Sequence, residues 1–297
     1  MPDKIAIIGS DSFLATYLVK DLSADHELVG YSRHNHNRLQ NHVSFDYPKQ
    51  KLDLDQLLDF NTVIYCAGSG IQAGQGEAHV YELNTYLPLE IALFLNTHAF
   101  KGTYITFGSY AEIGNNGVQK AYNEQDVLTS TLPVPNNYCV SKRMLSRFFN
   151  SANLNIRYLH LILPTIYGKG ENPNRLIPYL VNALINKEVP KLTSGYQTRQ
   201  YIHMKDVAAL LRLLITSLEA SSGIYNVPCY ETRLVRDIIE TIYKELDAGN
   251  SITPASLQRY DETMKYLELD SEKIRSQFPD WKPAISIVDS IGEYLDN

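Results

Sequence analysis

The sequence predicts an α/β fold in which a doubly wound parallel sheet is followed by a smaller C-terminal α/β lobe. Short runs of almost unbroken apolar residues alternate with segments of helical period through the first half of the chain, which is typical of parallel strands covered by helices on both faces. The first run also ends in a glycine and leads directly into a helix. The lobe is predicted because Pro164 and Gly168 end this alternation, and helices with short strands follow.

The elements of the sheet follow from local pattern, in chain order. Residues 4–9 form an apolar run, and the apolar positions of 13–20 recur at helical spacing. The remaining strands are expected at 27–32, 43–45, 62–66, 103–107 and 156–163, and the remaining helices at 52–60, 80–100, 174–186, 207–218 and 234–246. We expect Asp206 to cap the helix that begins at Val207. Residues 115–137 are the one long polar connection, and loops of that length often carry function.

The composition excludes several classes of protein. The 297 residues carry 27 Lys and Arg against 33 Asp and Glu, and no basic run is dense enough to follow a nucleic-acid backbone. No stretch approaches the roughly 20 apolar residues that cross a bilayer, so we expect no membrane partner. Cys66, Cys139 and Cys229 lie far apart in the sequence, which predicts neither a disulfide framework nor a metal site and favours a cytoplasmic location.

The turn after the first strand has the setting of a dinucleotide site. Such a site needs a strand, a turn whose amides approach a pyrophosphate, and a helix whose N-terminal dipole faces that charge. Gly9 supplies the turn, whereas Ser12 and Ala15 replace the second and third glycines of the usual pattern. We expect Gly9, Ser12, Phe13 and Leu14 to contact a cofactor, and an ordinary strand-to-helix turn is the alternative.

The end of the second strand predicts which dinucleotide is bound. A carboxylate there would hold the ribose hydroxyls of NAD(H), but this chain has Ser32 and Arg33, with Arg38 nearby. A hydroxyl and a guanidinium suit a ribose 2′-phosphate. The sequence therefore favours NADP(H) over NAD(H). The alternative is that both arginines only solvate a polar loop.

A tyrosine and a lysine one helical turn apart form a candidate catalytic pair. Tyr138 and Lys142 share one face of a predicted helix. A nearby ammonium favours the phenolate and lowers the usual phenol pKa of about 10, which brings it into the range of acid–base catalysis. Ser109 follows the fifth strand at the carboxyl edge of the sheet, where its hydroxyl can hold a substrate carbonyl or alkoxide. Each residue alone also has an ordinary structural interpretation.

Together these segments resemble the extended short-chain dehydrogenase/reductase family of NAD(P)-dependent sugar-nucleotide epimerases, dehydratases and reductases. The resemblance covers nearly the whole chain and rests on the glycine turn and on residues 63–68, 83–85, 108–114, 164–168 and 199–207. It implies a Rossmann-type dinucleotide-binding domain over 1–165, to which roughly 200–226 return, and a substrate-binding lobe made of 166–199 and 227–297. It also implies a sugar-nucleotide substrate and a homodimer.

The resemblance implies roles for further residues. Positions that match the family's cofactor contacts are Asp46, Cys66, Ala67, Gly68, Asn84, Tyr138 and Lys142. Asp46 matches an aspartate that contacts the adenine, and Asn84 an asparagine near the nicotinamide. On the substrate side, Ser109 matches the catalytic hydroxyl, and Arg199 matches an arginine that contacts the substrate diphosphate.

The residues around the serine favour one reaction of the family. A 4,6-dehydratase of this family carries an acid pair directly after the catalytic hydroxyl, where this chain has Tyr110 and Ala111. A C4 epimerase resembles an NAD binder with an acidic residue after the second strand, which this chain lacks. The sequence therefore predicts an NADPH-linked reductase of a 4-keto sugar nucleotide. A sugar-nucleotide C4 epimerase is the alternative, and a non-catalytic dinucleotide sensor is an alternative of another class.

Overall fold

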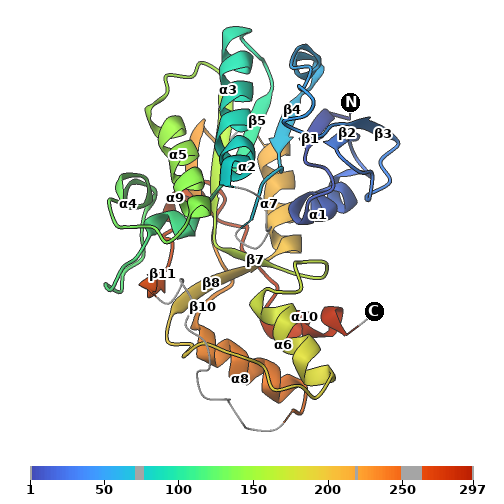
Figure 1. Ribbon diagram of the computed structural model, residues 1–297. Helices are drawn as coiled ribbons and strands as arrows, with labels where there is room; N and C mark the ends of the chain where they lie inside the picture. Colours follow the sequence, from blue (N-terminus) through green and yellow to red (C-terminus); the bar gives the residue numbers. More distant parts are fainter. Residues whose placement is uncertain (1, 71–76, 218–219, 249–262, 296–297) are drawn as a thin grey trace.

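The computed structural model describes residues 2–70, 77–217, 220–248 and 263–295, and a seven-stranded parallel sheet runs through it (Figure 1). Its strands lie in the order β3-β2-β1-β4-β5-β6-β9. Their bounds are β1 (Lys4–Ile8), β2 (Glu27–Ser32), β3 (Asn41–Ser44), β4 (Thr62–Tyr65), β5 (Thr103–Ser109), β6 (Arg157–Leu163) and β9 (Gly223–Asn226). The predicted doubly wound, Rossmann-type fold is confirmed.

Helices cover both faces of this sheet. One face packs against α1 (Phe13–Leu22) and α7 (Met204–Thr216), and the other against α3 (Leu87–Thr97) and α5 (Asn137–Ser151). Because side chains alternate along a strand, β1 sends Ile5 and Ile7 into one core and Ala6 and Ile8 into the other. All four side chains are fully buried, which explains why the strand reads as an unbroken apolar run.

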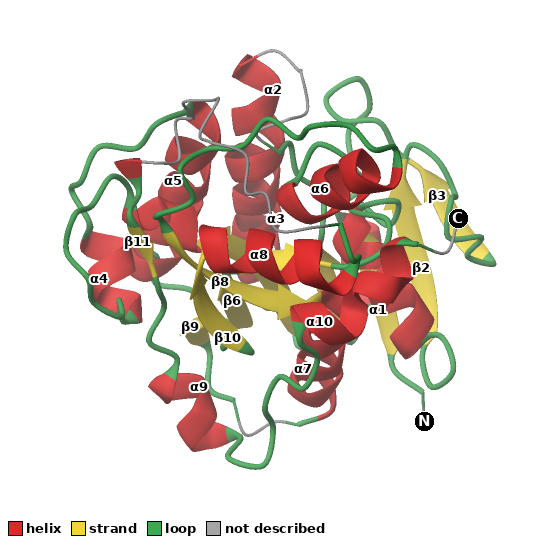
Figure 2. Cartoon of the chain, turned by 90° about the horizontal axis from the view of Figure 1, so that it is seen from below, coloured by secondary structure: helices red, strands yellow, loops and turns green. Residues whose placement is uncertain are grey.

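A second, smaller sheet lies beyond the carboxyl ends of the parallel strands (Figure 1). It contains β7 (Thr165–Tyr167), β8 (Thr198–His203), β10 (Glu231–Leu234) and β11 (Tyr266–Leu267), with β8 paired to each of the other three. Helices α6 (Leu176–Ile185), α8 (Val235–Glu245) and α10 (Ile287–Ser290) pack on it around a separate apolar core (Figure 2). Within the described ranges, no helix is long and apolar enough to cross a membrane.

Two predicted elements differ from the structure. The helix expected at 52–60 is only the short 3₁₀ turn η1 (Asp55–Asp59), whose start has no side-chain cap. The single helix expected at 80–100 is divided into α2 (Glu77–Tyr81), a wide turn η2 (Glu82–Tyr86) and α3. Pro88 has no N–H, so the regular hydrogen-bond ladder cannot continue through this point.

Local capping explains two further differences. The polar connection at 115–137 contains α4 (Glu124–Thr129), because Asn123 and Asp126 form a reciprocal capping box. The expectation that Asp206 caps a helix is wrong: α7 begins earlier, and the ring of His203 accepts a hydrogen bond from the backbone N–H of Lys205 at 3.2 Å. Asp206 instead accepts a hydrogen bond from the backbone of Ile285. The remaining short elements are η3 (Tyr110–Ile113), α9 (Glu272–Gln277) and η5 (Ile291–Tyr294).

Candidate active site

Two adjoining cavities lie at the carboxyl edge of the parallel sheet. The larger, of about 570 Å³, is bounded by the strand ends, by α5 and by the smaller lobe. The other, of about 320 Å³, lies beside the ends of β1, β2 and β4. Four residues line both cavities, namely Ser12, Ala67, Gly68 and Ser69. The order of the strands reverses between β1 and β4, and ligands of open α/β sheets bind at such a point.

The structure places every predicted site residue along these cavities. Gly9, Ser32, Arg33 and Asp46 line the smaller one. The larger one is lined by Ser12, Phe13, Leu14, Cys66, Ala67, Gly68, Asn84, Ser109, Tyr138, Lys142 and Arg199. The roles of these residues stay predictions.

Gly9 and the start of α1 form a turn that fits a pyrophosphate. Gly9 has a φ of 82°, in the left-handed region that favours glycine, and a Cβ there would lie 2.4 Å from the backbone nitrogen of Ala67. The Ser12 hydroxyl, at the position of the usual second glycine, turns back and accepts a hydrogen bond from Ala15 N at 3.2 Å. Phe13 and Leu14 at the start of α1 line the crevice, and first-turn amides without an intrahelical partner can bind an anion there.

The end of β2 is held by hydrogen bonds. The buried Ser32 hydroxyl contacts three neighbouring polar groups, whereas Arg33 is exposed at the cavity wall. Asp46 accepts a hydrogen bond from Lys49 Nζ at 2.7 Å, which holds the pKa of that carboxyl below its usual value. Arg38, the other arginine considered for a phosphate, lies outside both cavities.

Asn84 fixes the loop that follows β4. It lies in η2 and is buried. Its Oδ1 accepts a hydrogen bond from Ser69 N, and its Nδ2 donates to Ser69 O, both at 2.9 Å. The same Nδ2 lies 3.1 Å from Ser141 Oγ on α5. Asn84 therefore ties the loop beside the proposed cofactor site to the helix that carries Tyr138.

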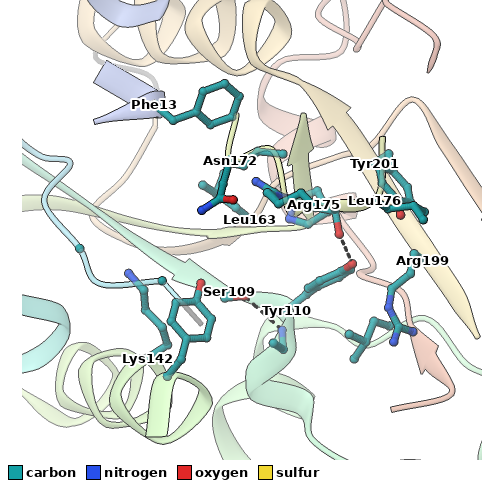
Figure 3. Close-up of a pocket in the computed structure, with 18 of the residues that line it drawn as sticks. Phe13, Ser109, Tyr110, Lys142, Leu163, Asn172, Arg175, Leu176, Arg199 and Tyr201 are labelled. Carbon is teal, nitrogen blue, oxygen red and sulfur yellow. Dashed lines mark hydrogen bonds between the residues drawn. The ribbon is translucent and has the colours of Figure 1, made fainter. Parts of the chain in front are cut away.

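Ser109, Tyr138 and Lys142 come together in the larger cavity. Ser109 ends β5, and the other two lie on the first turns of α5, which Asn136 caps with a hydrogen bond from Cys139 N at 3.0 Å. The Ser109 hydroxyl hydrogen bonds to the Tyr138 phenol. Lys142 Nζ donates to a backbone carbonyl of β5 at 2.9 Å. Figure 3 shows Ser109 and Lys142 on the same side of the cavity.

Burial sets the proton affinities of this group. It raises the pKa of Tyr138 to about 12, although the Ser109 hydrogen bond and the charge of Arg175 lower it. Burial lowers the pKa of Lys142 to about 8, and the carboxylate of Glu112 raises it. Lys142 Nζ is directed at a backbone carbonyl of β5, and the effect of burial on the phenol pKa outweighs the lowering that the sequence predicts. The phenol therefore stays protonated at neutral pH.

The larger cavity is lined by positive side chains. Among its described lining residues the charged ones are Lys142, Arg175, Lys191 and Arg199, and none is Asp or Glu. The buried Arg199 donates through Nη1 to two backbone carbonyls at 2.7 and 2.8 Å. Such a cavity favours an anionic ligand. In the described part of the chain, no group of three or more His, Cys, Asp or Glu side chains could hold a metal ion.

The arrangement of glycine turn, strand-end serine and paired tyrosine and lysine agrees with a comparison against family models. The model of the NAD dependent epimerase/dehydratase family matches residues 5–227. The chain belongs to this family. The resemblance to sugar-nucleotide-modifying extended short-chain dehydrogenases/reductases is thereby confirmed.

Individual family members are only distantly similar. The CDP-abequose synthase of Salmonella muenchen is 26% identical over 193 residues, which cover 62% of this chain and 60% of that protein. The dTDP-glucose 4,6-dehydratase of Escherichia coli is 26% identical over 157 residues, covering 46% of this chain. The matches therefore span 60% and 43% of the lengths of these two curated relatives.

Solved structures agree with the fold over nearly the whole chain. A dTDP-glucose 4,6-dehydratase from Bacillus anthracis in complex with NAD is 13% identical, with a TM-score of 0.80 over 99% of this chain and 97% of that one. A UDP-glucose 4-epimerase from Thermotoga maritima with UDP-glucose is 14% identical, with a TM-score of 0.80 over the same shares.

Arg175 is a further cation of the site, and no motif of the sequence indicates it. This residue caps α6 and points into the larger cavity (Figure 3). Its Nε lies 3.1 Å from Glu171 Oε2, and the buried Glu171 also accepts a hydrogen bond from the Tyr294 hydroxyl. In the sequence, Arg175 is simply part of a polar loop after Gly168. Its orientation depends on Glu171 and, through Glu171, on Tyr294, which is far away in the sequence.

Proposed function

We propose that the protein is an NADP(H)-dependent reductase that acts on a 4-keto sugar nucleotide. The observation that carries this proposal is the larger cavity, where a protonated phenol and a serine hydroxyl meet four cationic side chains and no described carboxylate. A reduction needs a proton donor and a carbonyl ligand. A dehydration also needs acid and base groups for neighbouring carbons, and the described lining offers no carboxyl group for them.

Each residue of the catalytic group has a defined part in this reduction. The bound cofactor supplies a hydride to the carbonyl carbon. The Ser109 oxygen accepts a hydrogen bond from the Ala111 N–H at 3.3 Å. When substrate binds, the Ser109 hydroxyl turns its proton from Tyr138 to the substrate carbonyl oxygen. Tyr138 gives its proton to the developing alkoxide. Lys142 carries positive charge close by, which stabilises the phenolate that remains.

The substrate side of the proposal rests on charge and on the lobe. Arg199 and Arg175 enter the larger cavity from β8 and from the start of α6. We assign the diphosphate of the substrate to Arg199, and substrate binding to the lobe formed by 166–199 and 227–297. The homodimer implied by the family resemblance stays a prediction.

The cofactor side rests on the smaller cavity. The Gly9 turn and the start of α1 suit the pyrophosphate. We assign the adenine contact to Asp46, which lines the same cavity. Arg33 lines this cavity and supports the choice of NADP(H), because its guanidinium can pair with a 2′-phosphate. NAD(H), which is bound in the Bacillus anthracis dehydratase structure, is the alternative.

The proposal is tested by product analysis with added cofactor. The purified protein is incubated with NADPH or NADH and a panel of 4-keto sugar nucleotides and of intact UDP-, GDP-, CDP- and dTDP-sugars. We expect one NADPH to be consumed for each 4-keto sugar reduced. Interconversion of an intact sugar nucleotide without added reductant would show a C4 epimerase instead. Cofactor binding without turnover of any sugar nucleotide would support the sensor.

A further inference from the structure

A buried carboxylate lies directly behind the catalytic serine. Glu112, in η3, is fully buried and does not line either cavity. Its Oε1 accepts a hydrogen bond from the backbone N–H of Ser109 at 2.7 Å. Together the two residues form a capping box, because the Ser109 hydroxyl caps η3 in return. Glu112 Oε2 is buried with no hydrogen-bond partner among the described residues.

A chain of polar side chains reaches Glu112 from the interior of the sheet. Thr106 Oγ1 lies 2.8 Å from Nδ1 of His160, and Nε2 of the same ring lies 2.8 Å from Ser146 Oγ. The Ser146 hydroxyl and the Glu112 carboxyl lie against the same point of the Gly108 backbone, and this hydroxyl lowers the pKa of the carboxyl. All four side chains are almost completely buried. If Ser146 donates to the carboxylate, His160 Nε2–H donates to Ser146 and Thr106 donates to Nδ1, so every bond points toward Glu112.

The side chains of Glu112, His160 and Ser146 pack tightly against β5 at Gly108. A Cβ on Gly108 would lie 2.8 Å from both Glu112 Oε1 and His160 Nε2, and 3.0 Å from Ser146 Oγ. The carboxyl group is therefore packed against the backbone of β5, one residue before Ser109. Burial raises the pKa of the Glu112 carboxyl, so its charged form at this point needs hydrogen bonds and opposite charges nearby, which lower that pKa again.

The compensating charges come from α5. Lys142 is half-buried and donates to the carbonyl of Phe107, next to the Gly108 backbone against which Glu112 packs. The Glu112 carboxylate is the largest influence that favours the charged form of Lys142. Arg143 donates to the backbone carbonyl of Glu112 at 2.9 Å and adds a second positive charge. The other titratable groups that face the carboxyl are Tyr138 and Cys139 on α5 and the neutral His160 on β6.

We propose that Glu112 is a positioning residue for the catalytic group: from outside the cavity it fixes the backbone of Ser109 and supplies the negative charge that keeps Lys142 an ammonium. This proposal rests on the proposed reductase function. Glu112 touches neither substrate nor cofactor. Glu112 supplies a negative charge near Lys142 from outside the cavity, so that no carboxylate lies in the cavity that is proposed to bind the anionic substrate.

The sign of the expected pH effect follows from these contacts. The Glu112 charge raises the pKa of Lys142 and also that of Tyr138. Loss of the charge lowers both pKa values, so that Lys142 and Tyr138 each lose their proton at a lower pH. A reduction needs both groups protonated. The basic limb of the pH profile of kcat must therefore move toward lower pH when the carboxylate is neutralised.

Two variants of Glu112 separate its charge from its hydrogen bond. Glu112→Gln keeps an oxygen that can accept from Ser109 N–H but carries no charge, whereas Glu112→Asp keeps the charge and shortens the reach. We expect Glu112→Gln to move the basic limb down by about one pH unit. Glu112→Asp should lower kcat about tenfold and leave the limb in place. Asp206→Asn is the matched control. This buried carboxylate also accepts a hydrogen bond from a backbone N–H, but it lies on α7, on the face of the parallel sheet opposite to α5.

A readout without substrate keeps this proposal distinct from the proposed function. The side chain of Lys142 is titrated by NMR in lysine-labelled protein, with its signal assigned from Lys142→Met. We expect a midpoint at about 8 in the wild type and a lower one in Glu112→Gln. Equal midpoints would overturn the role of Glu112 whether or not the protein reduces sugars. Normal titration with no turnover of any 4-keto sugar would overturn only the reductase.

A second variant serves if Glu112→Gln does not fold. The Ser146 hydroxyl lowers the pKa of the Glu112 carboxyl. Ser146→Ala removes this hydroxyl, so the pKa of the carboxyl should rise. Part of the negative charge is then lost, and the Lys142 midpoint should fall by a smaller amount. An unchanged midpoint in Ser146→Ala, with Glu112 still buried, would contradict the proposal.

Discussion

Tyr138 is the residue on which the proposed chemistry depends. It is a proton donor whose pKa burial raises to about 12, so almost every molecule carries the proton at neutral pH. Tyr138→Phe keeps the ring and removes the proton. We expect kcat for the keto sugar to fall by about a hundredfold or more, because that is the usual loss with a general acid. The dissociation constant for NADPH, measured by calorimetry, should change little; activity within about tenfold of the wild type would contradict the assignment.

Arg33 decides the cofactor preference in this account. It lines the smaller cavity, whereas Arg38 lies outside it. Arg33→Asp removes the guanidinium and places a negative charge where the 2′-phosphate is proposed to lie. We expect the dissociation constant for NADPH to rise about tenfold or more, while that for NADH changes less. Arg38→Asp is the matched control, and an equal loss of NADPH affinity in both variants would show a general charge effect.

Single residues of the site differ in how far the sequence predicts them. The spacing of Tyr138 and Lys142 predicts one helical face, and the structure places both on that face of α5. The Ser109–Glu112 spacing is that of a capping box, but it does not predict the burial of Glu112 or its relation to Lys142 and His160, which come from other elements. A pattern along the chain contains neither the direction of a side chain nor the charges across from it.

At the scale of elements, helix caps explain both the successes and the failures of sequence-based prediction. Long apolar strands are recovered almost to the residue, because both faces are buried and the run is unbroken. Short helices depend on one or two polar contacts, as α4 does on Asn123. The helix expected at 52–60 has no side-chain cap, and only one 3₁₀ turn forms. Helices α6 and α8 also lack such a cap, but several of their apolar residues are buried in the core of the lobe.

The cap of α5 links stability to activity. Asn136 caps this helix and lies two residues before Tyr138. Its Oδ1 accepts a hydrogen bond from Cys139 N. Asn136→Ala should lower the free energy of unfolding by about 1 kcal/mol and also lower kcat, because the first turn of α5 carries the phenol. Asn123→Ala, at the cap of α4, should cost similar stability with unchanged kcat. Thermal denaturation and steady-state kinetics measure both effects, and equal kcat values in the two variants would contradict this link.

At the scale of the whole molecule, tyrosines connect distant elements. The chain has 21 of them, and many combine a buried ring with a hydroxyl that donates to a backbone carbonyl. Tyr17 joins α1 to the substrate lobe through the carbonyl of Lys169, and Tyr167 joins β7 to the carbonyl of Ile285. The Tyr17 contact holds the lobe against α1, and the Tyr167 contact joins two distant segments of the lobe. The sequence shows the residues but not the carbonyls they reach, which explains why the lobe is the least predictable part of the fold.

The same tyrosines make the fold sensitive to alkali. Burial raises the pKa of Tyr17 and of Tyr138 to about 12, and raises those of Tyr65 and Tyr104 as well. A group with a raised native pKa stabilises the fold fully below its unfolded pKa of about 10, and this contribution is lost as pH rises toward the native value. We expect the melting temperature to fall steeply above about pH 10, with phenolate absorbance appearing together with unfolding. Ionisation of these tyrosines in a protein that stays folded would contradict this.

The central claim is that hydride and proton are delivered to one carbonyl in a cationic cavity. The most direct measurement uses NADPH that carries deuterium at the transferred position of C4, incubated with a 4-keto sugar nucleotide. The account predicts one deuterium at the former carbonyl carbon of the product, with one cofactor oxidised for each molecule and almost none transferred by Tyr138→Phe. An altered sugar nucleotide that carries no deuterium and leaves the NADPH unconsumed would contradict it.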